Sequence, residues 1–277
     1  MIATFRYEFH MQIRRPVLWI VYGLTFAALV AIQPKTYATL NLGGGEGTVP
    51  QTAMVASATL LMSLLPIVYG CLLADRLVRD RRLGVAGILD TTPTGRTTRL
   101  IGKYLGTCAA TVIPLALAYF GRAVAYAITE GEPSALGWAV AVFVAAIVPG
   151  LLFVGALALA GPLLMPPMLF QVLFVVYWFW GNLIPPSMMP TVSHSILSPN
   201  SQYVAYGLLG YHSPELPPNV IRSPEGEAYG PWPGGAALDF LRPVTTESVA
   251  FLWIGVMIVL ALSVLSLARL HATRTES

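Results

Sequence analysis

The chain has 277 residues and a mass of 29.8 kDa, with 56% hydrophobic residues, 10% charged residues and a mean hydropathy of +0.68. A soluble domain of this size carries about 25% charged residues, so the charge here is too sparse to cover a water-exposed surface. The composition excludes soluble enzymes and nucleic-acid-binding proteins. It predicts a protein whose apolar surface faces lipid.

The first residues predict a helix that lies at the membrane surface. Ile2, Phe5, Phe9 and Ile13 recur at spacings of three and four, with polar residues on the other faces. Pro16 is expected to end this helix and to turn the chain into the membrane. We therefore expect an interfacial amphipathic helix within residues 1–16.

Uniformly apolar stretches predict the membrane spans. A helix needs about 20 apolar residues to cross the hydrocarbon core, and backbone pairing in lipid favours helices for runs without alternation. The expected fold is an all-α membrane protein of six transmembrane helices in a single transmembrane domain, residues 1–277. The six spans are expected at 17–33, 52–74, 104–128, 138–161, 167–186 and 248–270.

The distribution of basic residues predicts the orientation. With the N-terminus in the cytoplasm, the six spans leave only four Lys or Arg residues outside, and basic residues concentrate on the cytoplasmic side. We expect both termini to be cytoplasmic, in a bacterial or archaeal plasma membrane. The four outer basic residues are Lys35, Arg122, Arg222 and Arg242, and the twelve inner ones are Arg6, Arg14, Arg15, Arg76, Arg79, Arg81, Arg82, Arg96, Arg99, Lys103, Arg269 and Arg274.

The polar segments carry no catalytic or cofactor motif. The loop around Gly43-Gly44-Gly45 lacks the lysine and the strand of a phosphate-binding loop, so no ATP site is expected in this chain. Ser193-His194-Ser195 lacks the GxSxG context of a hydrolase. Residues 187–247 are rich in proline and are expected to form an extracellular cap with short re-entrant helices. Cys71 and Cys108 lie in apolar segments and are expected to be reduced.

The most informative segment is the second inner loop, residues 75–103. It begins with a charged cluster, continues with a glycine-punctuated apolar stretch, stops at Pro93 and ends with Arg96, Gly102 and Lys103. Anchoring to anionic headgroups accounts for the charge but not for this order, which is typical of an element that docks on a cytoplasmic partner. The residues expected to make that contact are Arg79, Asp80, Arg81, Arg82, Leu83, Gly84, Ile88 and Leu89.

These residues resemble the membrane subunits of type 2 ATP-binding-cassette exporters, the ABC transporter permeases of that class. The resemblance covers nearly the whole chain and is sharpest over residues 79–103, where Val85 and Gly87 depart from the family pattern. The matching positions are Asp80, Gly84, Leu89, Pro93, Arg96, Gly102 and Lys103.

The resemblance implies a dimer of permease subunits, identical or not, each resting on a separate cytoplasmic ATPase that binds ATP and Mg²⁺. Residues 75–103 would then contain the coupling helix, and the chain would move an apolar or amphipathic substrate outward without being an enzyme itself. The alternatives are a secondary transporter or channel, and a membrane anchor of a signalling ATPase that transports nothing.

An aromatic run near the outer end of the fifth span has two readings. Tyr177, Trp178, Trp180 and Asn182 are typical of the aromatic belt that sits at the headgroup level. The same rings are also candidates for the lining of a substrate exit path.

Overall fold

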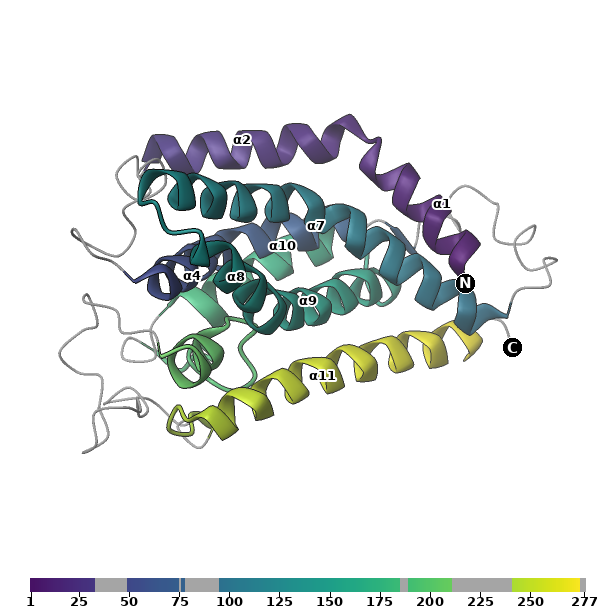
Figure 1. The fold of residues 1–277 in the computed structure, drawn as a ribbon. Helices are drawn as coiled ribbons and strands as arrows, with labels where there is room; N and C mark the ends of the chain where they lie inside the picture. The colour runs from purple at the N-terminus through teal and green to yellow at the C-terminus, as the bar shows by residue number, and fades with distance from the viewer. Residues whose placement is uncertain (33–48, 75, 78–94, 185–188, 211–240, 275–277) are drawn as a thin grey trace.

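The computed structural model describes residues 1–32, 49–74, 76–77, 95–184, 189–210 and 241–274. Every regular element within these ranges is a helix. Figure 1 shows the long helices arranged as a bundle, with α11 running along one side. The all-α fold predicted from the uniformly apolar runs is confirmed.

Helices occur at all six predicted spans. Among the described residues, four helical segments are long and apolar enough to cross a membrane, and two more are shorter apolar helices. The four are α4 (Pro50–Leu73), α7 (Arg96–Thr129), the run Ser134–Leu163 and α11 (Glu247–Arg274); the shorter two are α2 (Pro16–Ile32) and α10 (Pro167–Trp178), which continues as the π-helix η3 (Phe179–Leu183).

The run Ser134–Leu163 changes its helical winding before a proline. It consists of α8 (Ser134–Val142), the π-helix η1 (Phe143–Ile147), α9 (Val148–Ala160) and the 3₁₀-helix η2 (Gly161–Leu163). Pro149 has no amide hydrogen, and its ring would clash with a carbonyl one turn earlier in a regular helix. The π-helical turn directly before it relieves that clash.

The third predicted span starts earlier than the sequence suggested. We expected residues 104–128, but α7 begins at Arg96 and contains 34 residues. At about 1.5 Å per residue, α7 is about 51 Å long, against about 30 Å for the hydrocarbon core. The first turns of α7, which carry Arg99 and Lys103, precede the predicted span 104–128.

The core lies between α4, α7, α9 and α11. Leu65 and Leu73 of α4 and Leu159 of α9 have no exposed surface, and neither has Trp253 of α11. Both cysteines are free, as predicted. Large apolar side chains cover the outside of the bundle, which is the surface expected against lipid. Examples are Trp19, Ile20 and Leu24 of α2, Leu169, Val172 and Val176 of α10, and Phe251, Val259 and Leu262 of α11.

The two ends of the chain lie at the same end of the bundle. Figure 1 places the start of α1 (Ile2–Ile13) near the end of α11. The six predicted spans, an even number, would place both ends of the chain on one side of the membrane. We call this the terminal end of the bundle.

The opposite end holds a compact polar segment. Residues 189–210 and 241–246 connect α10 to α11 on either side of residues outside the described ranges. Within residues 187–247, where short helices were expected, the described part contains the π-helical turn η4 (Val204–Leu208). Whether η4 enters the membrane stays a prediction.

Candidate functional site

The predicted coupling residues Arg79, Asp80, Arg81, Arg82, Leu83, Gly84, Ile88 and Leu89 lie outside the described residues. The structure describes the helix that follows them, α7, and the helix packed against its first half, α1. A movement of the loop toward α7 would therefore act first on α7 and on α1, which packs against it.

Two glycines allow α1 to pack closely on α7. A Cβ at Gly102 would lie 3.0 Å from the carbonyl oxygen of Met1, and one at Gly106 would lie 2.6 Å from that of Phe5. The spacing of four residues is the small-xxx-small pattern by which helices approach in membranes. Met1 lies beside Gly102, and Phe5 lies beside Gly106. Residue numbers therefore rise in the same direction along both helices, which are parallel.

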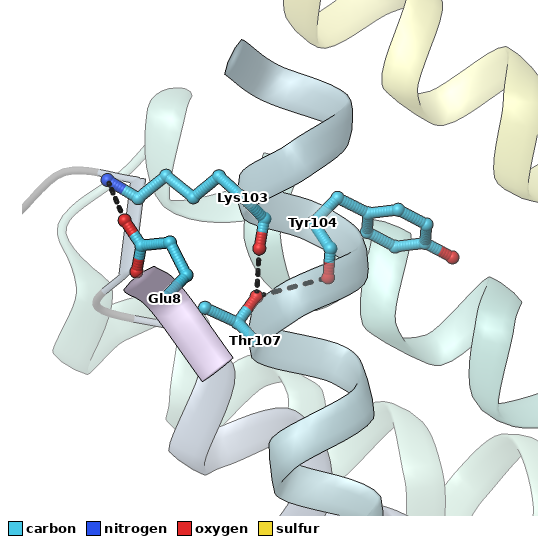
Figure 2. Close-up of polar contacts among 4 residues, drawn as sticks. All are labelled: Glu8, Lys103, Tyr104 and Thr107. Carbon is cyan, nitrogen blue, oxygen red and sulfur yellow. Dashed lines mark hydrogen bonds and ion pairs between the residues drawn. The ribbon is translucent and has the colours of Figure 1, made fainter. Parts of the chain in front are cut away.

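Polar side chains connect the same two helices. The Lys103 ammonium lies 3.6 Å from Oε1 of Glu8, and each side chain is 7% exposed (Figure 2). One helical turn further, Gln12 Nε2 donates a hydrogen bond of 2.9 Å to Oγ1 of Thr111. We call this contact the α1–α7 seam; it comprises Glu8, Gln12, Gly102, Lys103, Gly106 and Thr111.

The hydroxyl of Thr107 stays within α7. Its Oγ1 donates to the carbonyl oxygens of Lys103 and Tyr104, at 2.7 and 3.2 Å (Figure 2). Tyr104 in turn donates its hydroxyl proton to the carbonyl of Leu152 on α9 at 2.7 Å. The first turns of α7 are thus held to α9 as well as to α1.

A buried ion pair of this kind determines register more than it adds stability. Desolvation of two charges offsets most of their attraction, whereas loss of one partner leaves a buried charge that costs about 3–5 kcal/mol. Glu8 therefore favours only an α1 position that places it beside Lys103. Together with the glycine contacts, the ion pair makes α1 and the first half of α7 one rigid unit.

The face of α1 that packs against α7 is polar, and the sequence analysis made no prediction about this contact. Glu8 and Gln12 are 5% and 2% exposed, whereas Ile2 of the apolar stripe is 72% exposed. The helix itself is confirmed, but its most buried side chains are polar because α7 offers polar partners. The signals that sequence reasoning passed over were the Gly102–Gly106 spacing and a lysine between these glycines.

The seam connects directly to the first apolar helix. Between α1 and α2 the chain has only Arg14 and Arg15, and the backbone N–H of Leu18 donates to the Arg15 carbonyl. The indole of Trp19 donates to the Ile13 carbonyl at 2.9 Å. The seam is therefore continuous, through Arg14 and Arg15, with the start of α2.

The candidate substrate-path residues point in different directions. Trp178 is fully buried and its Nε1 donates to the Ser63 carbonyl of α4 at 2.7 Å. Asn182 is 4% exposed and its Oδ1 accepts from Ser198 at 2.7 Å. Trp180 is 38% exposed and Tyr177 is partly buried. Trp180 thus lies where a belt residue would, whereas Trp178 and Asn182 support the fold from inside.

A buried arginine organises the opposite end of the bundle, and sequence reasoning assigned it no role. Arg242 is 3% exposed. Its Nη2 donates to the Thr191 carbonyl at 2.7 Å, and its Nε donates to the Ser193 carbonyl at 3.1 Å. Trp253 of α11 donates to the Ser198 carbonyl at 2.8 Å. These bonds attach residues 191–198 to the start of α11.

His194 lies within this buried network. Its φ of 59° is in the left-handed region, and its carbonyl accepts from the Tyr203 hydroxyl at 2.9 Å. Burial lowers the pKa of His194 to about 4; the side-chain hydrogen bond to Gln202 opposes this change and the nearby Arg242 charge adds to it. His194 is therefore neutral at physiological pH.

Within the described part of the chain, no three His, Cys, Asp or Glu side chains gather as a metal site would require. No family model matches this chain, and no curated protein matches it.

Proposed function

We propose that this chain is the membrane-spanning permease subunit of an ATP-driven exporter of the ATP-binding-cassette type. In this proposal the six apolar helices are six spans in a bacterial or archaeal plasma membrane, with both termini in the cytoplasm. Two permease subunits pair, and each rests on a separate ATPase subunit that binds ATP and Mg²⁺. The all-helical bundle, its four long apolar segments and the motif of residues 79–103 support this assignment.

The α1–α7 seam is the observation on which the proposal depends. Residues 78–94 lead directly into α7, and the first half of α7 is packed against α1. Coupling needs an element whose position differs between two states and whose movement reaches the transport path. A rigid α1–α7 unit that continues into both α2 and the membrane part of α7 meets that requirement.

In the proposed mechanism, α1 and the first half of α7 move together. Closure of the ATPases displaces the coupling loop, and the contacts of Lys103 with Glu8 and of Gly106 with Phe5 make α1 move with α7. Because α1 leads into α2, the movement reaches α2 in addition to α4 and α7, the two helices that the loop joins. The apolar surface of the spans favours an apolar or amphipathic substrate.

The first experiment is purification of the tagged chain from its native membranes in mild detergent. We expect a cassette-type ATPase to co-purify in stoichiometric amount and ATP hydrolysis to accompany it. A chain that purifies alone and shows no hydrolysis would contradict the proposal and favour a channel or a secondary transporter. Hydrolysis that no substrate stimulates would favour a signalling anchor.

A charge-reversal variant tests the coupling loop. Arg81→Glu/Arg82→Glu should lower both ATPase co-purification and transport by about ten-fold or more while membrane insertion persists. Arg269→Glu is a control for charge reversal outside the loop, because Arg269 is an exposed residue of α11. Equal behaviour of the two variants would contradict the assigned role of residues 79–89.

A further inference from the structure

The face of α1 opposite the seam carries basic side chains in a row. Arg6, His10 and Arg14 are spaced by four residues and are all exposed. On a helix this spacing places them on one face, along about 12 Å. His10 is held in this row because its Nδ1 lies 2.7 Å from the Arg6 carbonyl oxygen. We call Arg6, His10 and Arg14 the basic stripe.

The basic stripe begins where the lipid-facing surface ends. Arg14 lies two residues before Pro16, the first residue of α2, and the exposed side chains that follow are Val17, Trp19 and Ile20. Trp19 is 43% exposed, and its indole bonds to the carbonyl of Ile13 in α1. Tryptophan concentrates at the headgroup level of membranes, so this level falls at the junction of α1 and α2.

The orientation of α1 keeps the whole stripe near that level. Figure 1 shows the chain bending between α2 and α1, so that α1 runs toward the start of α7 instead of prolonging α2. This bend reduces the distance between the far end of the basic stripe and the apolar surface of the bundle. Ile2, which flanks the stripe, is 72% exposed, and it gives α1 an apolar side toward the acyl chains.

The electrostatics of α1 select a negatively charged ligand. Among the described residues at the terminal end of the bundle, Glu8 is the one acidic residue, and it faces Lys103 on the other side of α1. Guanidinium groups bind phosphate oxygens with paired hydrogen bonds. A zwitterionic headgroup would also bring a cation against the stripe, whereas an anionic phospholipid brings none.

We propose that the basic stripe of α1 binds anionic phospholipids of the leaflet at the terminal end of the bundle. Each arginine contributes about a five-fold preference for anionic over zwitterionic lipid. Since α1 is joined to α7 through the seam, the bound lipids hold this two-helix unit at the membrane surface. The proposal is independent of the proposed transport function, because it needs neither an ATPase nor a substrate.

The test uses Trp19 as a local reporter. The full chain is reconstituted in phosphatidylcholine vesicles that contain brominated phosphatidylglycerol or, at the same mole fraction, brominated phosphatidylcholine. Bromine quenches tryptophan fluorescence on contact, and the difference between the wild type and Trp19→Phe isolates the signal of Trp19. We expect the quenching of Trp19 to correspond to a local concentration of brominated phosphatidylglycerol that is at least five-fold higher than that of brominated phosphatidylcholine.

Variants then assign the effect to the stripe. Arg6→Gln/Arg14→Gln should abolish the preference, and Arg6→Lys/Arg14→Lys should keep most of it. Arg14→Gln alone should reduce it about five-fold, whereas Arg269→Gln, which removes one exposed charge from α11 at the same end, should leave it unchanged. Because the stripe faces away from the seam, thermal unfolding of these variants in detergent should match the wild type.

Three outcomes would overturn the proposal. The first is equal quenching of wild-type Trp19 by the two brominated lipids, a comparison that needs no variant. The second is the same loss in Arg269→Gln as in Arg14→Gln, which would indicate net charge rather than a site. The third is an unchanged lipid preference in Arg6→Gln/Arg14→Gln combined with loss of a co-purifying protein, which would make the stripe a protein contact.

Discussion

Glu8 and Lys103 meet across two helices, 3.6 Å apart and each 7% exposed, at the point where the chain enters α7 from its second inner loop. Gly102 precedes this lysine and Gly106 follows it, and both allow the α1 backbone to approach. Charge and close packing thus coincide at one contact. This coincidence makes the seam specific for a single position of α1.

Loss of one charge at this contact should be costly, and loss of both should be mild. Lys103→Met leaves Glu8 as a buried carboxylate, so we expect a loss of about 3–5 kcal/mol in the free energy of unfolding. Glu8→Gln/Lys103→Met should recover most of that loss. Thermal unfolding in detergent, followed by tryptophan fluorescence, measures both. A double variant as unstable as the single one would show that the pair does not act as a unit.

Variants of the glycines should test the close packing of the α1–α7 seam separately from its ion pair. Gly106→Ala places a methyl group 2.6 Å from the Phe5 carbonyl oxygen, so α1 must shift; we expect a loss of about 1–3 kcal/mol. Gly121→Ala, on the same helix but with nothing within 4 Å of its Cβ, should be neutral or slightly stabilising. Cross-linking of cysteines introduced into α1 and α7 reports the displacement. An unchanged cross-linking yield in Gly106→Ala would exclude a tight seam.

The two tryptophans of the aromatic run should respond differently to leucine. Trp178→Leu leaves a cavity and removes the hydrogen bond to the Ser63 carbonyl, and we expect a loss of about 2–4 kcal/mol. Trp180→Leu, at a 38% exposed position, should change stability by less than about 0.5 kcal/mol. If Trp180 lines an exit path, only its variant changes substrate-stimulated ATPase activity in a stable protein. A change in expression alone would favour the belt reading.

Acidification should weaken the network around His194. The unfolded chain takes up a proton near the ordinary histidine pKa of 6.5, whereas folded His194 does so only near pH 4. The contribution to stability is therefore fully present above pH 6.5 and is lost as the pH falls from 6.5 to 4, by an amount on the order of 1 kcal/mol. Thermal unfolding of the wild type and of His194→Gln across this range measures it, and the variant should lack this part of the pH dependence.

Hydropathy predicted the fold class and the approximate position of every apolar helix, because each span is a local property of about 20 residues. The helix α7 begins before the predicted span 104–128, since a rule for lipid-embedded residues gives the bounds of a span and not those of the helix that contains it. The polar contacts of α1 were not predicted for a related reason. Glu8 and Gln12 are buried only because Lys103 and Thr111 lie opposite them, and no periodicity within α1 contains that information.

The candidate site was predictable to a smaller degree. Gly102 and Lys103 were recognised as part of a motif, but their contacts belong to the α1–α7 seam. Arg242 was counted only as an outer charge, although it holds the carbonyls of Thr191 and Ser193. Because every residue has a backbone carbonyl, the sequence does not show which carbonyls Arg242 binds. Residues 79–89, which carry the coupling prediction, lie outside the described residues, and that prediction stays a prediction.

The seam also has a consequence for biosynthesis. Gln12 leaves the ribosome long before Thr111, and 99 positions separate these hydrogen-bonded residues. Until the helix that begins at Arg96 has been translated, Glu8 and Gln12 have no side chains of α7 to bind. Their polar groups therefore stay in contact with water until α7 is made. The helix α1 is therefore synthesised well before the helix against which it packs.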